Sequence, residues 1–218
     1  MHSLKTMNTW LAKSRKFVAL CSRMLCLGAV FVWTLSASPA RADFLVRPVN
    51  LAYLTQRADI IVQGRVVEAR YEGLPNYPHI KTVLVTLEVE RMLRGPEGAR
   101  FTFRQFLLSS QMRSGKNAYL VGQRLLLFLP SPSDAGLSSP IGHEQGRFHI
   151  RRDASGRDEA ENEFGNSGLF KNVGTEAEKS GVGLNQAQMR VAATPRGSIA
   201  LSDLVSLVEH LMLLPRIE

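Results

Sequence analysis

Alternating hydrophobic and polar positions run through the middle of the chain and predict short β-strands. The strongest pattern spans residues 80–93, where Val83, Val85 and Leu87 alternate with more polar neighbours, so that one face is buried and the other is polar. Gly64 interrupts an earlier apolar run, and a glycine inside a strand pattern indicates a bulge or a sharp bend. The remaining predicted strands are residues 60–71, 101–106, 124–129 and 145–150. A hairpin turn is expected at 153–156, whereas the segment after it is too charged to be assigned as a strand.

A helix is predicted at each end of this group of strands. Residues 50–57 place Leu51 and Leu54 three positions apart, with Asn50 as the N-cap. Near the C-terminus, Ser202 is the expected N-cap of a helix with an apolar stripe, and Pro215 ends it. The residues of the stripe are Leu204, Val205, Leu207, Val208, Leu211 and Met212.

These elements predict a mainly β protein. The fold expected is a small OB-like antiparallel barrel with a short N-terminal helix and a C-terminal amphipathic helix, and a two-sheet sandwich is the alternative. Residues 43–164 form the barrel core in this interpretation, and the helix of 201–218 packs on the barrel. Residues 165–200 contain a Gly-rich stretch with no clear periodicity, which predicts a long surface excursion.

The first 42 residues have the order of a secretory signal peptide. A basic segment without acidic residues is followed by an apolar run from Met24 to Ala37 and by the small residues Ala40 and Ala42. A helix of that apolar run is about 21 Å long, which is short of the roughly 30 Å hydrocarbon core of a bilayer. We therefore expect cleavage after Ala42, export to a periplasm or the extracellular space, and no membrane span after cleavage.

Cleavage changes the meaning of the composition. The chain has 27 Lys and Arg and 19 Asp and Glu, and six of the basic residues but none of the acidic ones precede residue 43. The remainder is therefore nearly balanced, 21 against 19, so we expect no nucleic-acid partner. Both cysteines, Cys21 and Cys26, also lie in the leader. The mature domain must therefore be stabilised by its hydrophobic core and not by disulfides.

Several of the strand and turn segments have a family resemblance. They are residues 57–66, 89–95, 122–129, 146–148 and 165–170. Over about residues 50 to 170 the chain resembles uncharacterised exported bacterial proteins with the netrin-like, tissue-inhibitor-like pattern of an OB-type barrel. The resemblance implies a fold more than a function. Tissue inhibitors chelate a protease zinc with an N-terminal cysteine, whereas the expected mature N-terminus here is Asp43.

Two patterns suggest catalytic or metal chemistry. Ser167 lies between glycines, as in the nucleophile loop of serine proteases, but the following glycine of that loop is replaced by Leu169. A glycine-rich turn is the simpler interpretation. His143 and His149 are the weak candidates for metal ligands, and in an extended chain they would lie about 20 Å apart. Ordinary non-ligand histidines are the default, so neither a metal nor another cofactor is expected.

The function class that remains favoured is an exported binding or structural module without enzymatic activity. Its partner would be a protein or an envelope component, bound through loops 72–80, 108–120 and 165–197, because polar and flexible residues gather there. The alternative is a secreted or periplasmic hydrolase, either of the serine type around Ser167 or built on a histidine-bound metal.

Overall fold

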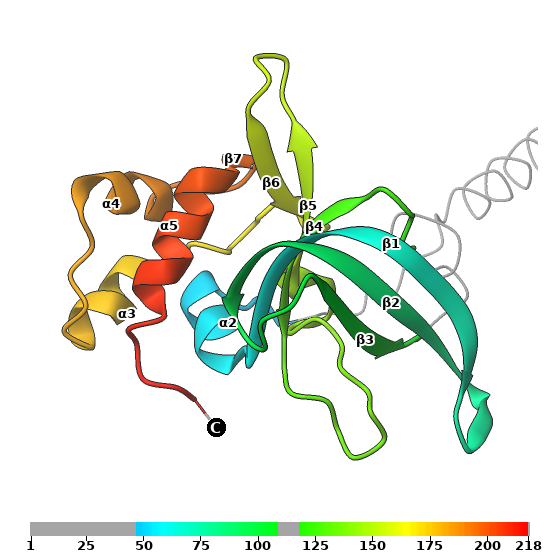
Figure 1. The fold of residues 1–218 in the computed structure, drawn as a ribbon. Coiled ribbons are helices and arrows are strands. Elements are labelled where there is room, and N and C mark those ends of the chain that lie inside the picture. The colour runs from blue at the N-terminus through cyan, green and yellow to red at the C-terminus, as the bar shows by residue number, and fades with distance from the viewer. Residues whose placement is uncertain (1–46, 109–117, 218) are drawn as a thin grey trace, which may run out of the picture. The chain divides into compact units, whose positions relative to one another are not determined.

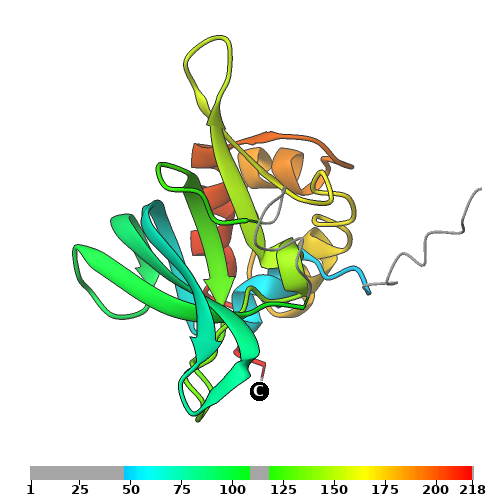
Figure 2. The same cartoon turned by 90° about the vertical axis from the view of Figure 1, so that its right-hand side faces the viewer.

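The computed structural model describes residues 47–108 and 118–217. Within these ranges a single antiparallel sheet carries short helices on one side (Figures 1 and 2). The strands are β1 (Ile60–Leu74), β2 (Tyr77–Arg94), β3 (Arg100–Phe106), β4 (Arg124–Leu129), β5 (Arg147–Arg152), β6 (Asp158–Asn162) and β7 (Ile199–Ala200). The helices are α2 (Leu51–Arg57), the 3-10 turn η2 (His143–Gly146), α3 (Val173–Lys179), α4 (Gln186–Ala192) and α5 (Leu201–Leu211).

The strand order in the sheet is β3-β2-β1-β4-β5-β6-β7. The predicted β-rich fold is therefore confirmed, but the closed barrel is wrong. Closure would need β3 to pair with a strand from the other end of the sheet. The strand β5 is hydrogen-bonded to β4 on one side and to β6 on the other, so it has no edge left for β3. The sheet curls through the long β1–β2 hairpin and stays open (Figure 1).

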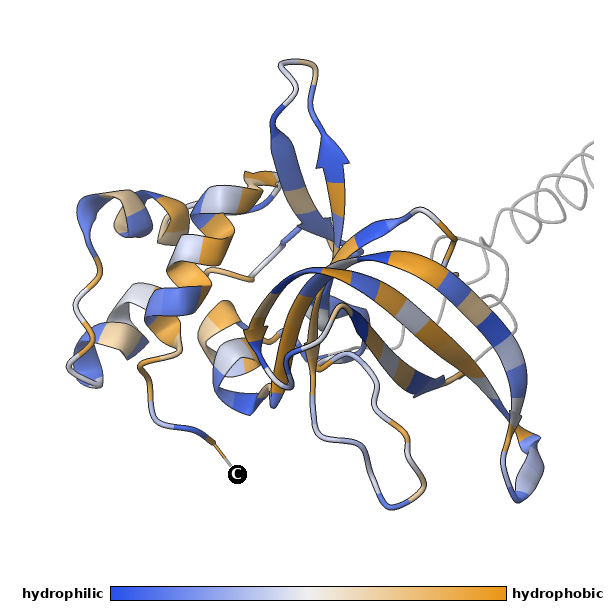
Figure 3. Ribbon diagram, viewed as in Figure 1, coloured by the Kyte–Doolittle hydropathy of each residue, from blue (hydrophilic) through white to orange (hydrophobic). Residues whose placement is uncertain are grey.

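Both faces of the sheet are covered, and this divides the hydrophobic core into two clusters. The alternation within β4 shows the division: Leu126 and Phe128 pack toward the helices, whereas Leu125 and Leu127 pack inside the curl of β1, β2 and β3. A strand buried on both faces needs a continuous apolar run, which is why β4 does not alternate in hydropathy. The outer parts of β1 and β2 do alternate, as the blue and orange segments of Figure 3 show.

The bulge predicted at Gly64 is confirmed. The β1–β2 register shifts between Gln63 and Gly64. A Cβ at position 64 would lie 2.6 Å from the carbonyl oxygen of Glu88, so only glycine allows the two backbones to approach this closely.

The two predicted end helices are present. Helix α2 begins after Asn50, whose side chain accepts a hydrogen bond from the Tyr53 amide as an N-cap does. Helix α5 begins two residues earlier than expected, so Ser202 lies inside the helix and the N-cap is Ala200. Its apolar stripe packs in the helix-side core cluster, as predicted from the spacing.

The segment predicted as a surface excursion differs from that expectation. Residues 165–197 contain helices α3 and α4, and their apolar residues Phe170, Val173 and Val191 belong to the helix-side core cluster. Each helix has only seven residues, so the period of 3.6 is sampled for about two turns and is hard to recognise. Strand β6 also occupies the segment judged too charged for a strand.

Candidate functional site

Ser167, the candidate nucleophile, lies in the turn that follows β6. The residue is exposed, and its backbone amide donates to the Phe164 carbonyl oxygen at 3.2 Å. Within residues 47–108 and 118–217, its hydroxyl has no hydrogen-bond partner. Ala42, the expected cleavage site, lies outside the described residues.

The two candidate metal ligands have different surroundings. His143 is exposed and begins η2, with a φ of 60°. His149 lies on β5 and is only 8% exposed. Its partners are a glutamine and a glutamate and not a second histidine. Among the described residues, no three His, Cys, Asp or Glu side chains are grouped closely enough to hold a metal ion.

A line of hydrogen bonds passes through His149. The Gln123 amide Nε2 lies 2.8 Å from His149 Nδ1, and His149 Nε2 lies 2.7 Å from Glu163 Oε1. Since an amide nitrogen donates, Nδ1 must accept, and the proton of the neutral ring is on Nε2 facing the carboxylate. The backbone amide of Leu120 donates to Gln123 Oε1 at 3.3 Å, which fixes the same orientation of the glutamine.

Burial lowers the pKa of His149 below its ordinary value, and the positive charges of Arg147 and Arg151 lower it further. The carboxylate of Glu163 acts in the opposite direction but does not reverse the shift. The ring is therefore neutral at neutral pH and gains a proton only in acid.

Next to His149, a polar cluster is buried in the curl of the sheet. Arg147 is completely buried, and its guanidinium donates to Glu144 Oε2 at 3.1 Å and to the Ala118 carbonyl oxygen at 2.9 Å. It also lies over the Tyr119 ring, 4.0 Å from the centroid. Gln105 completes the cluster by accepting from the Tyr119 hydroxyl and donating to Glu144 Oε1 at 3.3 Å.

The cluster joins β3, η2, β5 and the residues before β4 by side chains where the sheet has no backbone pairing. Burial raises the pKa of the Glu144 carboxyl, although Arg147 partly offsets this effect. Burial also raises the pKa of the Tyr119 hydroxyl, so the phenol is neutral. The cluster therefore contains one close ion pair and otherwise neutral groups.

The four residues 120–123 form a tight turn, which we call the rim turn. The Gln123 amide donates to the Leu120 carbonyl oxygen at 3.0 Å, and Gly122 has a φ of 89°, a value that favours glycine at the third position of a turn. The turn is attached to β1, because the Gly122 amide donates to the Val66 carbonyl oxygen and the Val66 amide donates to the Gln123 carbonyl oxygen, both at 2.8 Å.

Two aliphatic side chains of the rim turn point into solvent. Leu120 is 60% exposed and Val121 is 71% exposed. The preceding residue, Tyr119, contacts the Phe103 ring on β3 and reaches Gln105 there with its hydroxyl. Exposed apolar side chains are thus held on an anchored backbone.

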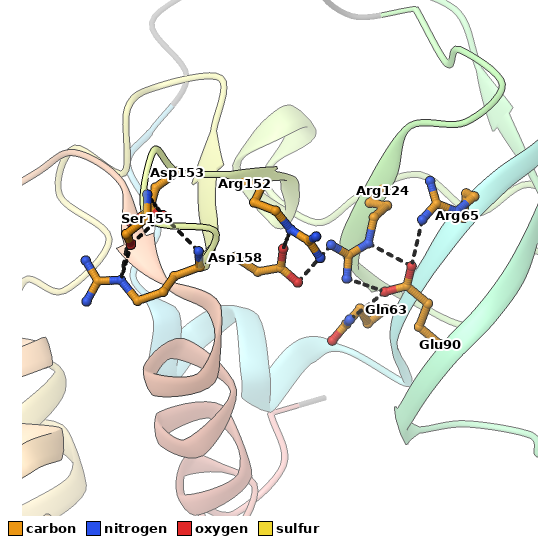
Figure 4. A network of polar contacts seen from close by, with 9 residues as sticks. Gln63, Arg65, Glu90, Arg124, Arg152, Asp153, Ser155 and Asp158 are labelled. Carbon is orange, nitrogen blue, oxygen red and sulfur yellow. Dashed lines mark hydrogen bonds and ion pairs between the residues drawn. The ribbon is translucent and has the colours of Figure 1, made fainter.

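A second polar network crosses the helix-side face of the sheet (Figure 4). Arg124 binds both oxygens of Glu90 at 2.8 and 2.7 Å and reaches Asp158 at 2.8 Å. These contacts join β4 to β2 and β6, and they lower the pKa of both carboxyls. Gln63 and Arg65 add contacts from β1 to Glu90. The network explains why the charged β6 is a strand, because its acidic side chain has a fixed cationic partner.

The structure also contains a hollow of about 550 Å³ between α3 and α4. Apolar side chains line part of it, including Phe170, Val173, Leu184 and Met189. The hollow has neither the buried polar scaffold nor the anchored turn found at the rim.

Sequence reasoning named His149 only as an alternative metal ligand, with no metal as the expectation, and it did not select Gln123, Glu163 or Arg147 as site residues. One signal was present. In β5 the polar Arg147 and His149 alternate with Phe148 and Ile150, and the following acidic residues alternate in the same way. Such a pattern is expected when two paired strands place their polar residues on one face.

Comparisons with known proteins give no family for this chain. It matches no protein-family model and no curated protein sequence. Among the described residues, no helix is long and apolar enough to cross a membrane.

Proposed function

We propose that this protein is an exported binding module that holds a protein or an envelope component at the rim turn. The observation that carries the proposal is the exposure of Leu120 and Val121 on a turn whose backbone is anchored to β1. Exposed aliphatic groups on a fixed backbone lose little conformational entropy on binding, so their burial contributes more fully to affinity.

The surrounding contacts support a rigid binding surface. Tyr119 precedes the turn, and its amide donates to the Tyr71 hydroxyl at 3.0 Å. Arg65 donates to the Gly122 carbonyl oxygen at 3.1 Å on the other side of the turn. Both ends of the turn are thus tied to β1.

The fold relationship is part of the same proposal. Strands β1 to β5 form an open, OB-like half-barrel of the netrin-like type. Support comes from the order β3-β2-β1-β4-β5, which is what a five-stranded barrel would have if it were cut between β3 and β5. The contact of Gln105 with Glu144 spans that gap. The rim of an OB-type barrel is a common place for binding loops.

The test is capture from the host's envelope and culture medium with the immobilised exported protein. The wild-type protein is compared with a Leu120→Ser/Val121→Ser variant and with a Met189→Ser/Leu213→Ser control, which changes two exposed apolar residues elsewhere. We expect wild type and control to retain the same partner and the rim-turn variant to lose it about tenfold or more, which corresponds to about 1.4 kcal/mol.

Equal capture by the two double variants would place the binding surface elsewhere, and a wild-type protein that retains nothing above a blank matrix would contradict a binding role. Mass spectrometry of the protein from its own host reports the N-terminus in the same preparation. We expect Asp43 as the first residue, and a first residue within the leader would contradict export by cleavage after Ala42.

A further inference from the structure

The hydrogen bonds through His149 run in one direction, from the rim turn to Glu163. The Leu120 amide donates to Gln123 Oε1, Gln123 Nε2 donates to His149 Nδ1, and His149 Nε2 donates to Glu163 Oε1. Each donor thus faces an acceptor only while the ring is neutral, because its Nδ1 must be without a proton.

Protonation of His149 places a second donor opposite the Gln123 NH₂ group. Two donors at 2.8 Å repel each other, so the arrangement cannot persist. The simplest relief is rotation of the Gln123 amide, which brings Oε1 toward Nδ1–H. The NH₂ group then faces the Leu120 amide, and the hydrogen bond from Leu120 is lost.

We propose that Gln123 relays the protonation state of His149 to the rim turn, so that acid removes the Leu120–Gln123 side-chain hydrogen bond. The rim turn then keeps the bond from the Gln123 amide to the Leu120 carbonyl oxygen and its two bonds to Val66, and loses its additional side-chain bond. Leu120 and Val121 become less constrained. The relay concerns the turn itself and holds whether or not the turn binds a partner.

Charged side chains from several elements surround His149 and act on its protonation in opposite directions. Arg147 and Arg151 lie on its own strand and disfavour the charged ring. From β6 and the turn after it, Glu161 is the residue paired with His149, and Glu163 is hydrogen-bonded to the ring and favours the charge. The carboxyl of Glu144 in η2 lies near enough to interact with Glu163. On β4 the paired residue is the uncharged Leu125.

The relay is tested by nuclear magnetic resonance on the ¹⁵N-labelled exported protein between pH 8 and the onset of acid unfolding. We expect the Leu120 amide shift and the His149 ring signals to change with the same midpoint. His149→Gln has no titrating ring and should abolish the change at Leu120. His79→Gln is the matched control, because His79 is exposed at the β1–β2 hairpin, and it should leave the change intact.

Three results would overturn the relay. The first is a Leu120 amide chemical shift that stays constant while His149 titrates, and the second is a His149 ring that stays neutral until the protein unfolds. The third is a pH-dependent change of the Leu120 amide shift that persists in His149→Gln. The last result would assign the change to a group other than His149. If His149→Gln does not fold, Gln123→Met provides the second variant. It removes the relay group, so His149 should still titrate while the Leu120 amide no longer follows it.

Discussion

Replacing Arg147 with methionine should destabilise the protein strongly, because it leaves the Glu144 carboxylate buried without its cation. Methionine keeps a similar volume but loses the ion pair at 3.1 Å, the bond to the Ala118 carbonyl oxygen and the contact with the Tyr119 ring. Breaking a buried pair by removing one partner costs about 3–5 kcal/mol. We therefore expect the free energy of unfolding at pH 7 to fall by about 4 kcal/mol.

The measurement is urea unfolding followed by two probes whose coincidence checks two-state behaviour. With a slope of about 2 kcal/mol per molar urea, the expected loss lowers the midpoint by about 2 M. The matched control is Arg151→Met, which removes the same charge from an exposed position on the same strand and should change stability by less than about 0.5 kcal/mol.

A double variant separates the stranded charge from the lost packing. Arg147→Met/Glu144→Gln contains no buried charge at this site, so we expect it to be more stable than Arg147→Met alone by about 1 kcal/mol or more. The pH dependence has a definite sign. Burial raises the pKa of Glu144 in the folded state, and loss of Arg147 raises it further, so the cost of Arg147→Met should be smaller at acid pH and grow as pH rises toward 7. A double variant no more stable than Arg147→Met, or a cost that does not depend on pH, would refute this reasoning.

Three further changes have expected outcomes. Burial lowers the folded-state pKa of His149, so its contribution to stability is present above the unfolded value near 6.5 and is lost as pH falls toward the folded value. The free energy of unfolding measured from pH 8 to 5 should therefore decline, and His149→Gln should reduce that decline. An unchanged decline in the variant would contradict the assignment. Gly64→Ala should lower the melting temperature, because the added Cβ would lie 2.6 Å from the Glu88 carbonyl oxygen and overpacking costs about 1–3 kcal/mol. The control Gly183→Ala places its Cβ in open space, so it should have little effect in the same thermal scan. Asn50→Ala removes the N-cap of α2 and two further side-chain hydrogen bonds, one of them to the Lys171 carbonyl oxygen just before α3. The free energy of unfolding measured in urea should fall by about 1–2 kcal/mol. A loss indistinguishable from zero would mean that this cap is dispensable.

The elements predicted from sequence were those whose local chemistry is sufficient to define them. Asn50 caps its helix through its own side chain, Gly64 is required by a close backbone approach, and β4 is a continuous apolar run. The turn after β5 is likewise local: Asp153 accepts from the Ser155 hydroxyl and from backbone amides, and these contacts lower its pKa to about 2. Each of these features depends on residues within a few positions of one another, except the close approach at Gly64, where the neighbour is distant Glu88. There the glycine inside a strand pattern was itself the signal.

The features that sequence reasoning missed depend on partners distant in the chain. Strand β6 was rejected for its charge, yet Asp158 is bound to Arg124, which lies 34 positions earlier. Helix α4 is short, but its capping box of Asn185 and Gln188 was a readable local signal that a search for longer periodicity overlooked. Closure of the barrel could not be judged from strand count, because it depended on whether β5 would pair with β3 or with β6.

The same distinction explains why the candidate site had to come from the structure. The sequence shows His149 and Glu163 as residues 14 positions apart, with no spacing that predicts a contact, and Gln123 as an ordinary residue before a strand. The antiparallel β4–β5–β6 arrangement brings the three together, because His149 is paired with Leu125 on one side and with Glu161 on the other. Gln123 and Glu163 are each two residues beyond those partners, and in a strand that spacing returns to the same face. The site therefore follows from strand register, and a one-residue slip would move His149 to the opposite face and separate it from both partners.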